Sequence, residues 1–279
     1  MDASLTGGYT IRAFETIEEF QECVELQEDT WGHGFSERVA PAILKVSQIL
    51  GGIAAGAYSE AGDLDGFVFG MTGLREGEIV HWSDMLAVRG PARDRGLGTC
   101  LKAYQREQVL PLGVEKMHWT FDPLQSRNAY LNFAKLGIVV REYAEDMYGQ
   151  TDSPLHRGIG TDRFIALWLL MSHRVVYRLS GAAPPHAPPE RAVSVLGASG
   201  EGALPRPGEP DVSRGNDELL VTIPSDIAAI MDDSMDLALE WRRATRTVFV
   251  HYLAAGYEVK EIFRGERTSQ YMLVQTDDE

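Results

Sequence analysis

The most informative segment of this chain is Arg93-Asp94-Arg95-Gly96-Leu97-Gly98. It follows the apolar run Met85-Leu86-Ala87-Val88 and leads into strong helix formers over residues 99–108. A strand, a glycine-containing loop and a helix start, in that order, place unpaired backbone N–H groups at the positive end of a helix dipole. The segment therefore predicts a site for a phosphate or pyrophosphate.

The residue sequence of this loop excludes two common phosphate-binding motifs. No Gly-Lys-Ser/Thr follows the glycines, so the loop is not a P-loop, and Leu101 stands where the dinucleotide fingerprint has its third glycine. Glycine at these positions keeps side chains away from a ligand and tolerates positive φ in a tight turn. An ordinary strand-to-helix turn is the structural alternative.

Composition sets the outer limits of the function. The chain has 279 residues, of which 44% are hydrophobic and 24% charged, as in a globular protein with one large or two modest domains. A formal net charge of −15 argues against nucleic acid as a partner and is compatible with either a cationic amine substrate or solubility alone. Two cysteines, Cys23 and Cys100, give no disulfide framework, and no apolar run is long enough to span a bilayer. We expect a cytoplasmic protein without membrane insertion.

Strand and helix signals alternate over about the first 175 residues. Thr16 and Glu19 form a capping box for a helix, and a second helix is predicted from Ser36 to Ile49. The predicted order is β-α-α-β-β-β-α-β-α-β-β, which implies a mixed sheet of the α/β class. The strands are expected at residues 9–14, 52–58, 64–72, 79–88, 116–121, 138–143 and 164–171, and the later helices at residues 99–110 and 125–136. On the strand over residues 79–88, period-two alternation would place His81, Ser83 and Met85 on one face and Trp82, Asp84 and Leu86 on the other.

The rest of the chain divides into a linker and a small α/β unit. Residues 180–216 are rich in Pro, Gly and Ser, which predicts a linker or surface excursion. Beyond it we expect a strand at 219–223, an N-cap at Ser225, one or two helices over 231–255 and a hairpin over 257–275. The predicted domains are residues 1–178, a linker at 179–216 and a C-terminal extension at 217–279. Residues 133–142 align without a gap with residues 252–261, which suggests an internal repeat or a chance likeness.

Two motifs together resemble the GNAT N-acetyltransferase superfamily. Arg93, Gly96 and Gly98 occupy the places of its Arg/Gln-x-x-Gly-x-Gly/Ala acyl-CoA loop. About thirty residues later, Ala129, Lys135 and Gly137 match its helix motif Asn-x-x-Ala-x-x-x-Tyr-x-Lys-x-Gly-Phe. Three positions depart from that motif: Ser126 replaces its asparagine, Phe133 its tyrosine and Ile138 its phenylalanine. The resemblance covers about residues 9–172 and is closest to a bacterial subgroup with a C-terminal α/β extension, here resembling half a GNAT domain.

The resemblance implies a binding site for acetyl-CoA or another acyl-CoA. In that fold two central parallel strands separate, and the pantetheine arm enters between them. The cofactor-binding candidates are the strand end Leu86, Ala87 and Val88, the loop and helix start Arg93, Asp94, Arg95, Gly96, Leu97, Gly98 and Thr99, and the later helix residues Ser126, Asn128 and Asn132. No metal is implied.

The residues that would carry the chemistry are less well specified. The family places its base on the strand before the loop, which makes Asp84 and His81 candidates, with Asp84 favoured and His118 on the neighbouring strand. Because Phe133 cannot protonate a thiolate, the acid would be Tyr130, Tyr143, Tyr148 or water. The catalytic set is therefore Asp84, His81 and Tyr148. In the polar loop over residues 148–163, His156, Arg157 and Arg163 are candidates to receive a substrate carboxylate or to pair with Asp152 and Asp162.

The sequence thus predicts an acyl-CoA-dependent N-acyltransferase, using an acetyl, succinyl or other acyl group, that acts on a small amine such as an amino acid. Two alternatives stay open. One is an acyl-CoA-binding protein with little or no turnover, and the other is a protein N-acetyltransferase. A homodimer is compatible with each of them.

Overall fold

A computed structural model describes residues 8–149, 158–199 and 204–276 of the chain. Its contacts divide the chain into two compact units. The first unit extends to Trp119 and also includes Leu169–Met171, whereas the second begins at Thr120 and contains most of the remaining residues. Each unit is described by itself below.

The first unit is built on a sheet in the order β1-β2-β3-β4-β5. Its elements are β1 (Thr10–Ala13), α1 (Ile17–Trp31), α2 (Pro41–Ile49), β2 (Ile53–Tyr58), β3 (Leu64–Arg75), β4 (Glu78–Val88), α3 (Leu97–Val109) and β5 (Lys116–Phe121), whose last two residues belong to the second unit. Neighbouring strands from β1 to β4 are antiparallel, and β4 pairs with β5 in parallel. The mixed α/β sheet and the predicted element order are confirmed.

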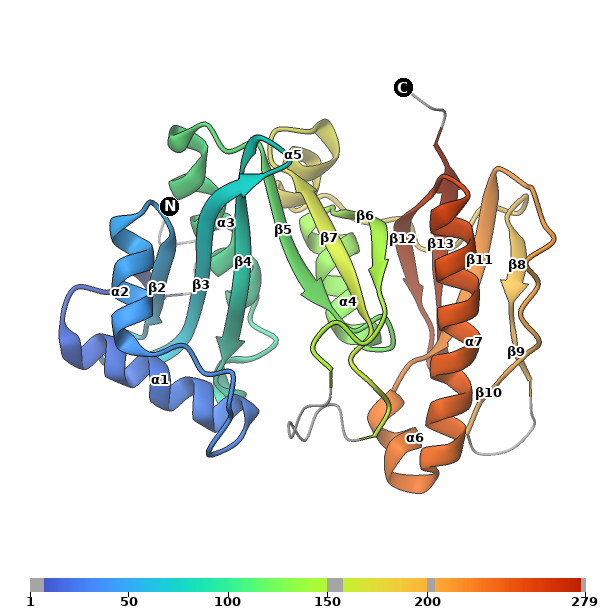
Figure 1. Cartoon of the computed structure of the whole chain (residues 1–279), viewed down its shortest axis with the longest axis horizontal. Helices are drawn as coiled ribbons and strands as arrows, with labels where there is room; N and C mark the ends of the chain where they lie inside the picture. The colour runs from blue at the N-terminus through green and yellow to red at the C-terminus, as the bar shows by residue number, and fades with distance from the viewer. Residues whose placement is uncertain (1–7, 150–157, 200–203, 277–279) are drawn as a thin grey trace. The chain divides into compact units, whose positions relative to one another are not determined.

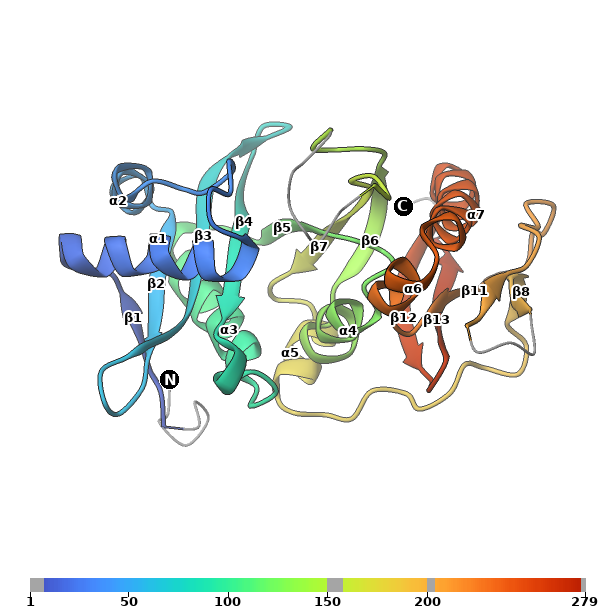
Figure 2. The same ribbon diagram turned by 90° about the horizontal axis from the view of Figure 1, so that it is seen from below.

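Helices cover both faces of this sheet, with α1 and α2 on one face and α3 on the other (Figures 1 and 2). Beneath α1 and α2 lies a buried cluster that includes Phe20, Leu44 and Phe67. Beneath α3 lies a second cluster that includes Val68 and Leu101. The middle of this sheet is therefore buried on both faces, as in β2 and in β3 from Phe67 to Gly70.

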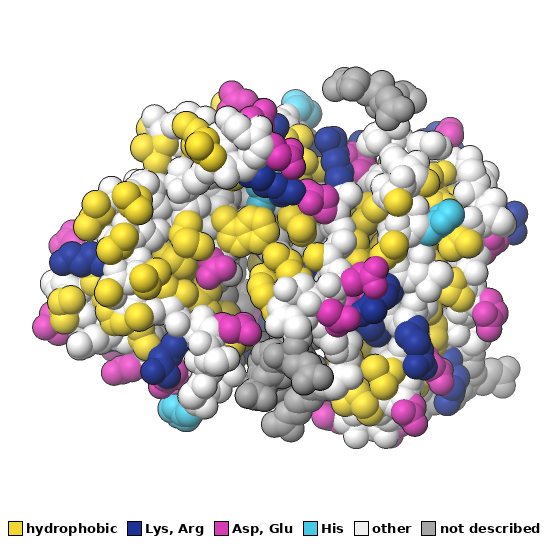
Figure 3. All heavy atoms as spheres, viewed as in Figure 1, with side chains coloured by type: hydrophobic (Ala, Val, Ile, Leu, Met, Phe, Trp, Pro, Cys, Tyr) yellow, Lys and Arg dark blue, Asp and Glu magenta, His cyan; other side chains and the backbone are white. Residues whose placement is uncertain are grey.

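The two N-terminal helices begin where local chemistry dictates. The capping box of α1 is confirmed, because the Thr16 hydroxyl accepts from the Glu19 amide and the Glu19 carboxylate accepts from the Thr16 amide. The second helix begins at Pro41 rather than at the predicted Ser36. Proline disfavours a helical conformation in the residue before it, here Ala40, but fits the first helical turn. Exposed apolar side chains gather along α2 (Figure 3), including Ile43, Ile49 and Leu50.

The second unit contains a sheet in the order β7-β6-β12-β13-β11-β8, with helices on both faces (Figure 2). Its elements are α4 (Ser126–Tyr130), a π-helical turn (Leu131–Leu136), β6 (Val139–Ala144), β7 (Arg163–Leu169), α5 (His173–Leu179), β8 (Val193–Leu196), β9 (Ala198–Ser199), β10 (Arg206–Pro207), β11 (Glu218–Pro224), α6 (Ile227–Asp233), α7 (Met235–Ala254), β12 (Tyr257–Arg264) and β13 (Thr268–Gln275). The predicted C-terminal strand and hairpin are present, and the one or two helices expected over 231–255 are the two helices α6 and α7, of which α6 begins earlier, at Ile227. The N-cap of α6 is Asp226 rather than the predicted Ser225, whose hydroxyl donates to the Gly265 carbonyl.

The segment expected as a linker carries regular structure. Strand β8 pairs in parallel with β11, and β9 pairs with β10. Helix α5, which the sequence did not indicate, precedes it and is capped by the Ser172 hydroxyl. The main division between the two compact units falls after Trp119. The domain boundaries at 178 and 216 stay a prediction.

The segments that align in the sequence also correspond in structure. Val140 of β6 and Val259 of β12 occupy the same position in the alignment, and they pair with each other. Each strand carries a register shift directly after this residue, at Arg141 and at Lys260. Each helix before the strand ends near a glycine of positive φ, +75° at Gly137 and +86° at Gly256. These shared irregularities favour a true repeat over chance, because a bulge is a local feature of one particular strand.

Candidate functional site

The glycine loop presents a concentration of positive charge and backbone amides. Gly96 is the N-cap of α3 with a φ of +82°, and a Cβ placed there would meet no atom within 4 Å. Arg93, Asp94 and Arg95 are exposed, and Arg93 Nε donates to the Val88 carbonyl at 2.8 Å, which ties the loop to the end of β4. The first amides of a helix have no partner within that helix. The loop therefore fits a pyrophosphate, which would bind to these amides with two guanidinium groups nearby.

Strands β4 and β5 pair only over a short stretch. Their pairs run from Val80 with Lys116 to Trp82 with His118, and the described residues show no further pair between them. Strand β4 nevertheless continues to Val88 and β5 to Phe121. The β5-facing edge of β4 from Ser83 onward is therefore open to hydrogen bonding by something other than β5.

A β-bulge interrupts β4 at the start of this open edge. Phe69 of β3 pairs with Met85 and Gly70 pairs with Ser83, so Asp84 is the extra residue. The bulge overturns the predicted alternation. His81 and Ser83 face α3, whereas Met85 joins the core beneath α1 and α2. An inserted residue shifts the period of two by one, and bulges commonly re-aim side chains beside active sites.

Asp84 stands out by its electrostatics. Its side chain reaches solvent, yet the surrounding protein removes enough water to raise the pKa of its carboxyl, and the nearby charge of Glu37 raises it further. Glu37 lies in the segment between α1 and α2. Two carboxylates close together favour a cation, and a carboxyl with a raised pKa is a better base than an ordinary aspartate.

His81 is held in a different environment. It is fully buried, its Nδ1 lies 2.9 Å from the Thr72 hydroxyl, and its Nε2 lies 2.9 Å from Gln105 Nε2. Burial, with a smaller effect of Lys102, lowers the pKa of His81 to about 3. A neutral imidazole with a polar partner at each nitrogen is a packed residue of the core beneath α3 and is not placed to take a proton from a substrate. His118 is also buried, and its ring stacks on Trp82.

The structure adds one residue that the sequence reasoning missed. Lys102 of α3 is only 5% exposed, its Nζ donates to the Ser83 hydroxyl at 2.6 Å, and it lies 3.7 Å from the centroid of the Trp119 ring. Burial lowers the pKa of Lys102 well below its ordinary value. The sequence signal that could have identified it is a lysine at a buried position of the helix that follows the glycine loop.

The α4 candidates belong to the second unit. Ser126 is buried, and its hydroxyl lies 2.7 Å from that of Ser269. Asn132 is buried in the π-helical turn, whereas Asn128 is exposed. Phe133 is fully buried, with edge-to-face contacts to Phe121 and Tyr271. The position of the family's tyrosine is thus part of the apolar core.

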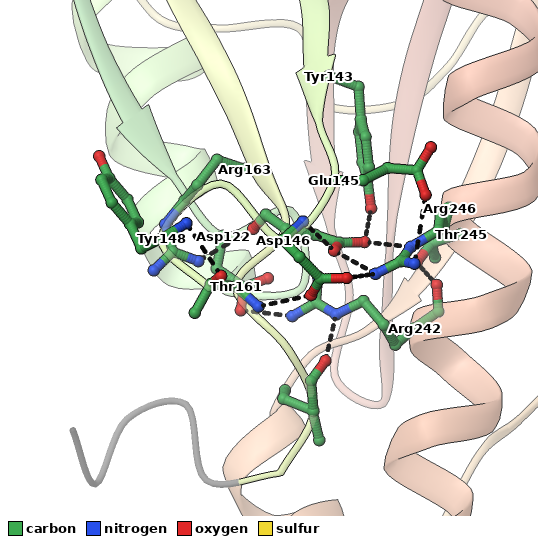
Figure 4. A network of polar contacts seen from close by, with 12 residues as sticks. Asp122, Tyr143, Glu145, Asp146, Tyr148, Thr161, Arg163, Arg242, Thr245 and Arg246 are labelled. Atoms are coloured by element: carbon green, nitrogen blue, oxygen red, sulfur yellow. Dashed lines mark hydrogen bonds and ion pairs between the residues drawn. The ribbon is translucent and has the colours of Figure 1, made fainter. Parts of the chain in front are cut away.

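Tyr148 lies at the edge of a polar network in the second unit (Figure 4). Its hydroxyl is 2.8 Å from that of Thr120, and the Arg163 guanidinium lies over its ring. Tyr143 donates instead to Asp162, and burial, followed by the Asp162 charge, raises the pKa of its phenol. Tyr148, 41% exposed, is therefore the more accessible of these two phenols. The predicted substrate residues His156 and Arg157 lie outside the described residues.

Two further features concern ligands. A cavity of about 290 Å³ in the second unit is lined by residues that start α4 and α6, together with Arg264. Among the described residues, no group of three or more His, Cys, Asp and Glu side chains is arranged to hold a metal ion. Nor does any helix in the described ranges have the length and apolarity needed to cross a membrane.

No protein-family model and no curated protein sequence matches the chain. Its structure is similar to that of several acetyltransferases. The ribosomal-protein-S18-alanine N-acetyltransferase of Escherichia coli is 16% identical, with a TM-score of 0.46 over 58% of this chain and 94% of that one. A putative acetyltransferase of Salmonella typhimurium with acetyl-CoA is 17% identical, with a TM-score of 0.47 over 60% and 96%. A GNAT-superfamily phosphinothricin acetyltransferase of Sinorhizobium meliloti is 14% identical, with a TM-score of 0.46 over 57% and 87%.

Proposed function

We propose that this chain is an acyl-CoA-dependent N-acyltransferase of the GNAT type that acts on a small amine. One observation carries the proposal. The edge of β4 that β5 leaves open begins at Ser83, includes the bulged residue Asp84 and runs into the glycine loop and the start of α3. A candidate base, open strand amides and an anion site therefore follow one another along one segment of the first unit.

Each part of this segment has a chemical task in the proposal. The amides at the start of α3, with Arg93 and Arg95, hold the pyrophosphate, and the open edge toward Leu86, Ala87 and Val88 holds the pantetheine. An acyl-CoA bound there supplies an acyl group activated as a thioester. Amides of β4 that β5 does not use can polarise the acyl carbonyl as negative charge develops on its oxygen.

Asp84 is the proposed base. An amine is mostly protonated at neutral pH, so a carboxylate that attracts the ammonium and takes its proton favours attack by nitrogen. Glu37 adds a second negative charge near Asp84, which favours binding of the acceptor as an ammonium cation. A small amine or amino acid that presents its ammonium to these carboxylates fits this arrangement.

The test is acyl transfer by the purified chain. It would be incubated with acetyl-CoA, succinyl-CoA and longer acyl-CoAs against a panel of amines and amino acids, with detection of the released thiol. We expect thiol release that depends on both the acyl donor and the amine. Native mass spectrometry of the same sample measures retained CoA independently. Neither binding nor release with any donor would contradict the proposal.

A second function is favoured by Phe133. Because the position of the family's tyrosine is buried in the apolar core, the chain lacks the usual proton donor there, and a protein that binds acyl-CoA with little turnover would have the same feature. In that case CoA is retained, no thiol is released, and Asp84→Asn leaves affinity unchanged. Transfer to peptide N-termini rather than to small amines would indicate a protein N-acetyltransferase.

A further inference from the structure

The side chain of Lys102 occupies the point where β4 and β5 part. The last pair between the two strands is Trp82 with His118, and the next residue on each strand is Ser83 and Trp119. These are the two residues that Lys102 contacts, through a hydrogen bond to Ser83 and through the face of the Trp119 ring. A single amine therefore lies in the fork from which the open edge of β4 begins.

The surroundings of this amine are unusual for a buried lysine. Buried lysines are normally paired with a carboxylate, because an isolated charge is costly in a low dielectric. The described contacts of Lys102 Nζ are a hydroxyl and an indole face instead. On the elements packed around it, His81 is neutral, and Asp84 is exposed, with a pKa raised by burial of its surroundings and by the charge of Glu37. Because burial lowers the pKa of Lys102 and neither contact carries a negative charge, an anion arriving beside Nζ would stabilise the ammonium form.

We propose that Lys102 is a catalytic residue that donates a proton to the sulfur of the departing CoA thiolate, in place of the missing tyrosine. This inference rests on the proposed acyltransferase function. The fork lies one residue before the proposed base Asp84, at the end of the open edge of β4 that is farther from the glycine loop. An acyl-CoA whose pyrophosphate and pantetheine lie as proposed would bring its thioester toward this end. The sulfur of a thioester at that place faces the Lys102 ammonium across the gap between Ser83 and Trp119.

The step balances in atoms and charge. The acceptor enters the step as a neutral amine, because its ammonium proton has already passed to solvent through Asp84. Its nitrogen forms a bond to the acyl carbon, and a second proton passes from that nitrogen to the Asp84 carboxylate. The carbon–sulfur bond breaks, its electron pair goes to sulfur, and Lys102 Nζ gives sulfur a proton. Lys102 leaves the step as a neutral amine, Asp84 leaves it as a neutral acid, and exchange of one proton through solvent restores both. The products are the N-acyl amine and CoA with a free thiol.

The first experiment measures binding rather than turnover. CoA would be bound to the wild-type chain and to Lys102→Met, which preserves side-chain size in the apolar surroundings. The ultraviolet absorbance of the thiolate would then be followed against pH. A free thiol has a pKa of about 8.5. We expect the wild-type chain to lower the pKa of the bound CoA thiol by about one unit or more, a tenfold change in its ionisation, and Lys102→Met to abolish that shift.

Lys116→Met is the control, because it removes the same charge from a partly exposed lysine of β5 that pairs with Glu78. It should leave the thiol pKa as in the wild-type chain. An equal thiol pKa in wild type and Lys102→Met would overturn the role of Lys102 while leaving the proposed function intact. Failure of CoA to bind any of the three proteins would overturn the proposed function itself. If Lys102→Met does not fold, as judged by circular dichroism, Lys102→Gln replaces it in the comparison.

The second experiment varies the leaving group. Proton donation by a positioned side chain typically contributes about 10² to 10⁴-fold, so Lys102→Met should slow turnover with acetyl-CoA within that range and change KM little. The leaving group of an acetyl thioester made from a more acidic thiol needs less protonation. With that donor, the ratio of the wild-type rate to the Lys102→Met rate should therefore be smaller than with acetyl-CoA. An equal deficit for both donors contradicts the proposal. So does an acyl group found on Lys102 itself by mass spectrometry, because Lys102 would then be an acceptor.

Discussion

At Asp84, one inserted residue changes which face of β4 the neighbouring side chains occupy. A regular strand would place His81, Ser83 and Met85 together, but the bulge sends Met85 to the core beneath α1 and α2. Asp84 is left at the turn of the bulge, near Glu37, with a raised pKa. The electrostatic difference between Asp84 and an ordinary surface aspartate thus originates in backbone register.

Asp84→Asn should reduce acyl transfer by about 10² to 10⁴-fold, because an amide cannot accept the proton of the acceptor amine. CoA affinity should be unchanged. In the wild-type chain the rate should fall as the pH drops through the raised pKa of Asp84 and the carboxylate becomes protonated, and this acid limb should be absent in the variant. Rate profiles against pH and CoA titrations measure both effects. Asp63→Asn, in the turn between β2 and β3, is the control, and an equal loss there would contradict the assignment.

Gly96→Ala tests the loop. The φ of +82° at Gly96 lies in the region that costs a residue with a Cβ about 1–2 kcal/mol, and a methyl group there would also meet an approaching pyrophosphate. We expect CoA affinity to fall tenfold or more in a calorimetric titration. Gly90→Ala lies in the same loop with no positive φ and with open space around its Cβ, so it should bind CoA as the wild-type chain does. Unchanged affinity in Gly96→Ala would place the pyrophosphate elsewhere.

Among the elements, those with strong local signals were predicted well. The capping box of α1 and the hairpin of β12 and β13 depend on neighbouring residues, and both form as expected. The features missed depend on distant contacts or on one extra residue. The bulge at Asp84 is set by pairing with β3, and β8 forms only because β11 lies beside it. For the candidate site, the glycine loop could be predicted because its residues are consecutive in the sequence. The position of Lys102 between Ser83 and Trp119 could not, because only the fold brings these three residues together.

The ends of the two repeated helices provide a comparison between equivalent positions. Gly137 and Gly256 both have positive φ, so alanine should destabilise each by about 1–2 kcal/mol. At Gly137 a Cβ would also lie 3.0 Å from Arg178 Cγ and 3.2 Å from the Arg174 carbonyl oxygen, whereas at Gly256 it meets nothing within 4 Å. Gly137→Ala should therefore lower the urea midpoint further than Gly256→Ala does. Equal midpoints would mean that Arg174 and Arg178 of α5 move away from the added methyl group without a loss of stability.

At the scale of the molecule, the second unit joins parts of the chain that sequence reasoning had separated. Asp122, Tyr143 and Asp162 come from the region that resembles the GNAT family, and Arg242 and Arg246 come from the extension, yet all belong to one network (Figure 4). Hydrogen bonds from Arg246 and Tyr143 hold the pKa of Asp162 below its ordinary value, although its burial alone would raise it. The extension therefore contributes directly to the packing of residues that precede it by about a hundred positions.

The Asp122–Arg242 pair allows this coupling to be measured. The two side chains are 2% and 3% exposed, with Arg242 Nη2 donating to Asp122 Oδ2 at 2.6 Å. Removing one partner of a buried pair leaves an uncompensated charge, so Asp122→Asn and Arg242→Met should each lower the free energy of unfolding by about 3–5 kcal/mol. The double variant should lose much less than the sum of the two, because it buries no unpaired charge. Additive losses in urea unfolding would show that the extension and the preceding region are stabilised independently, in keeping with separate domains.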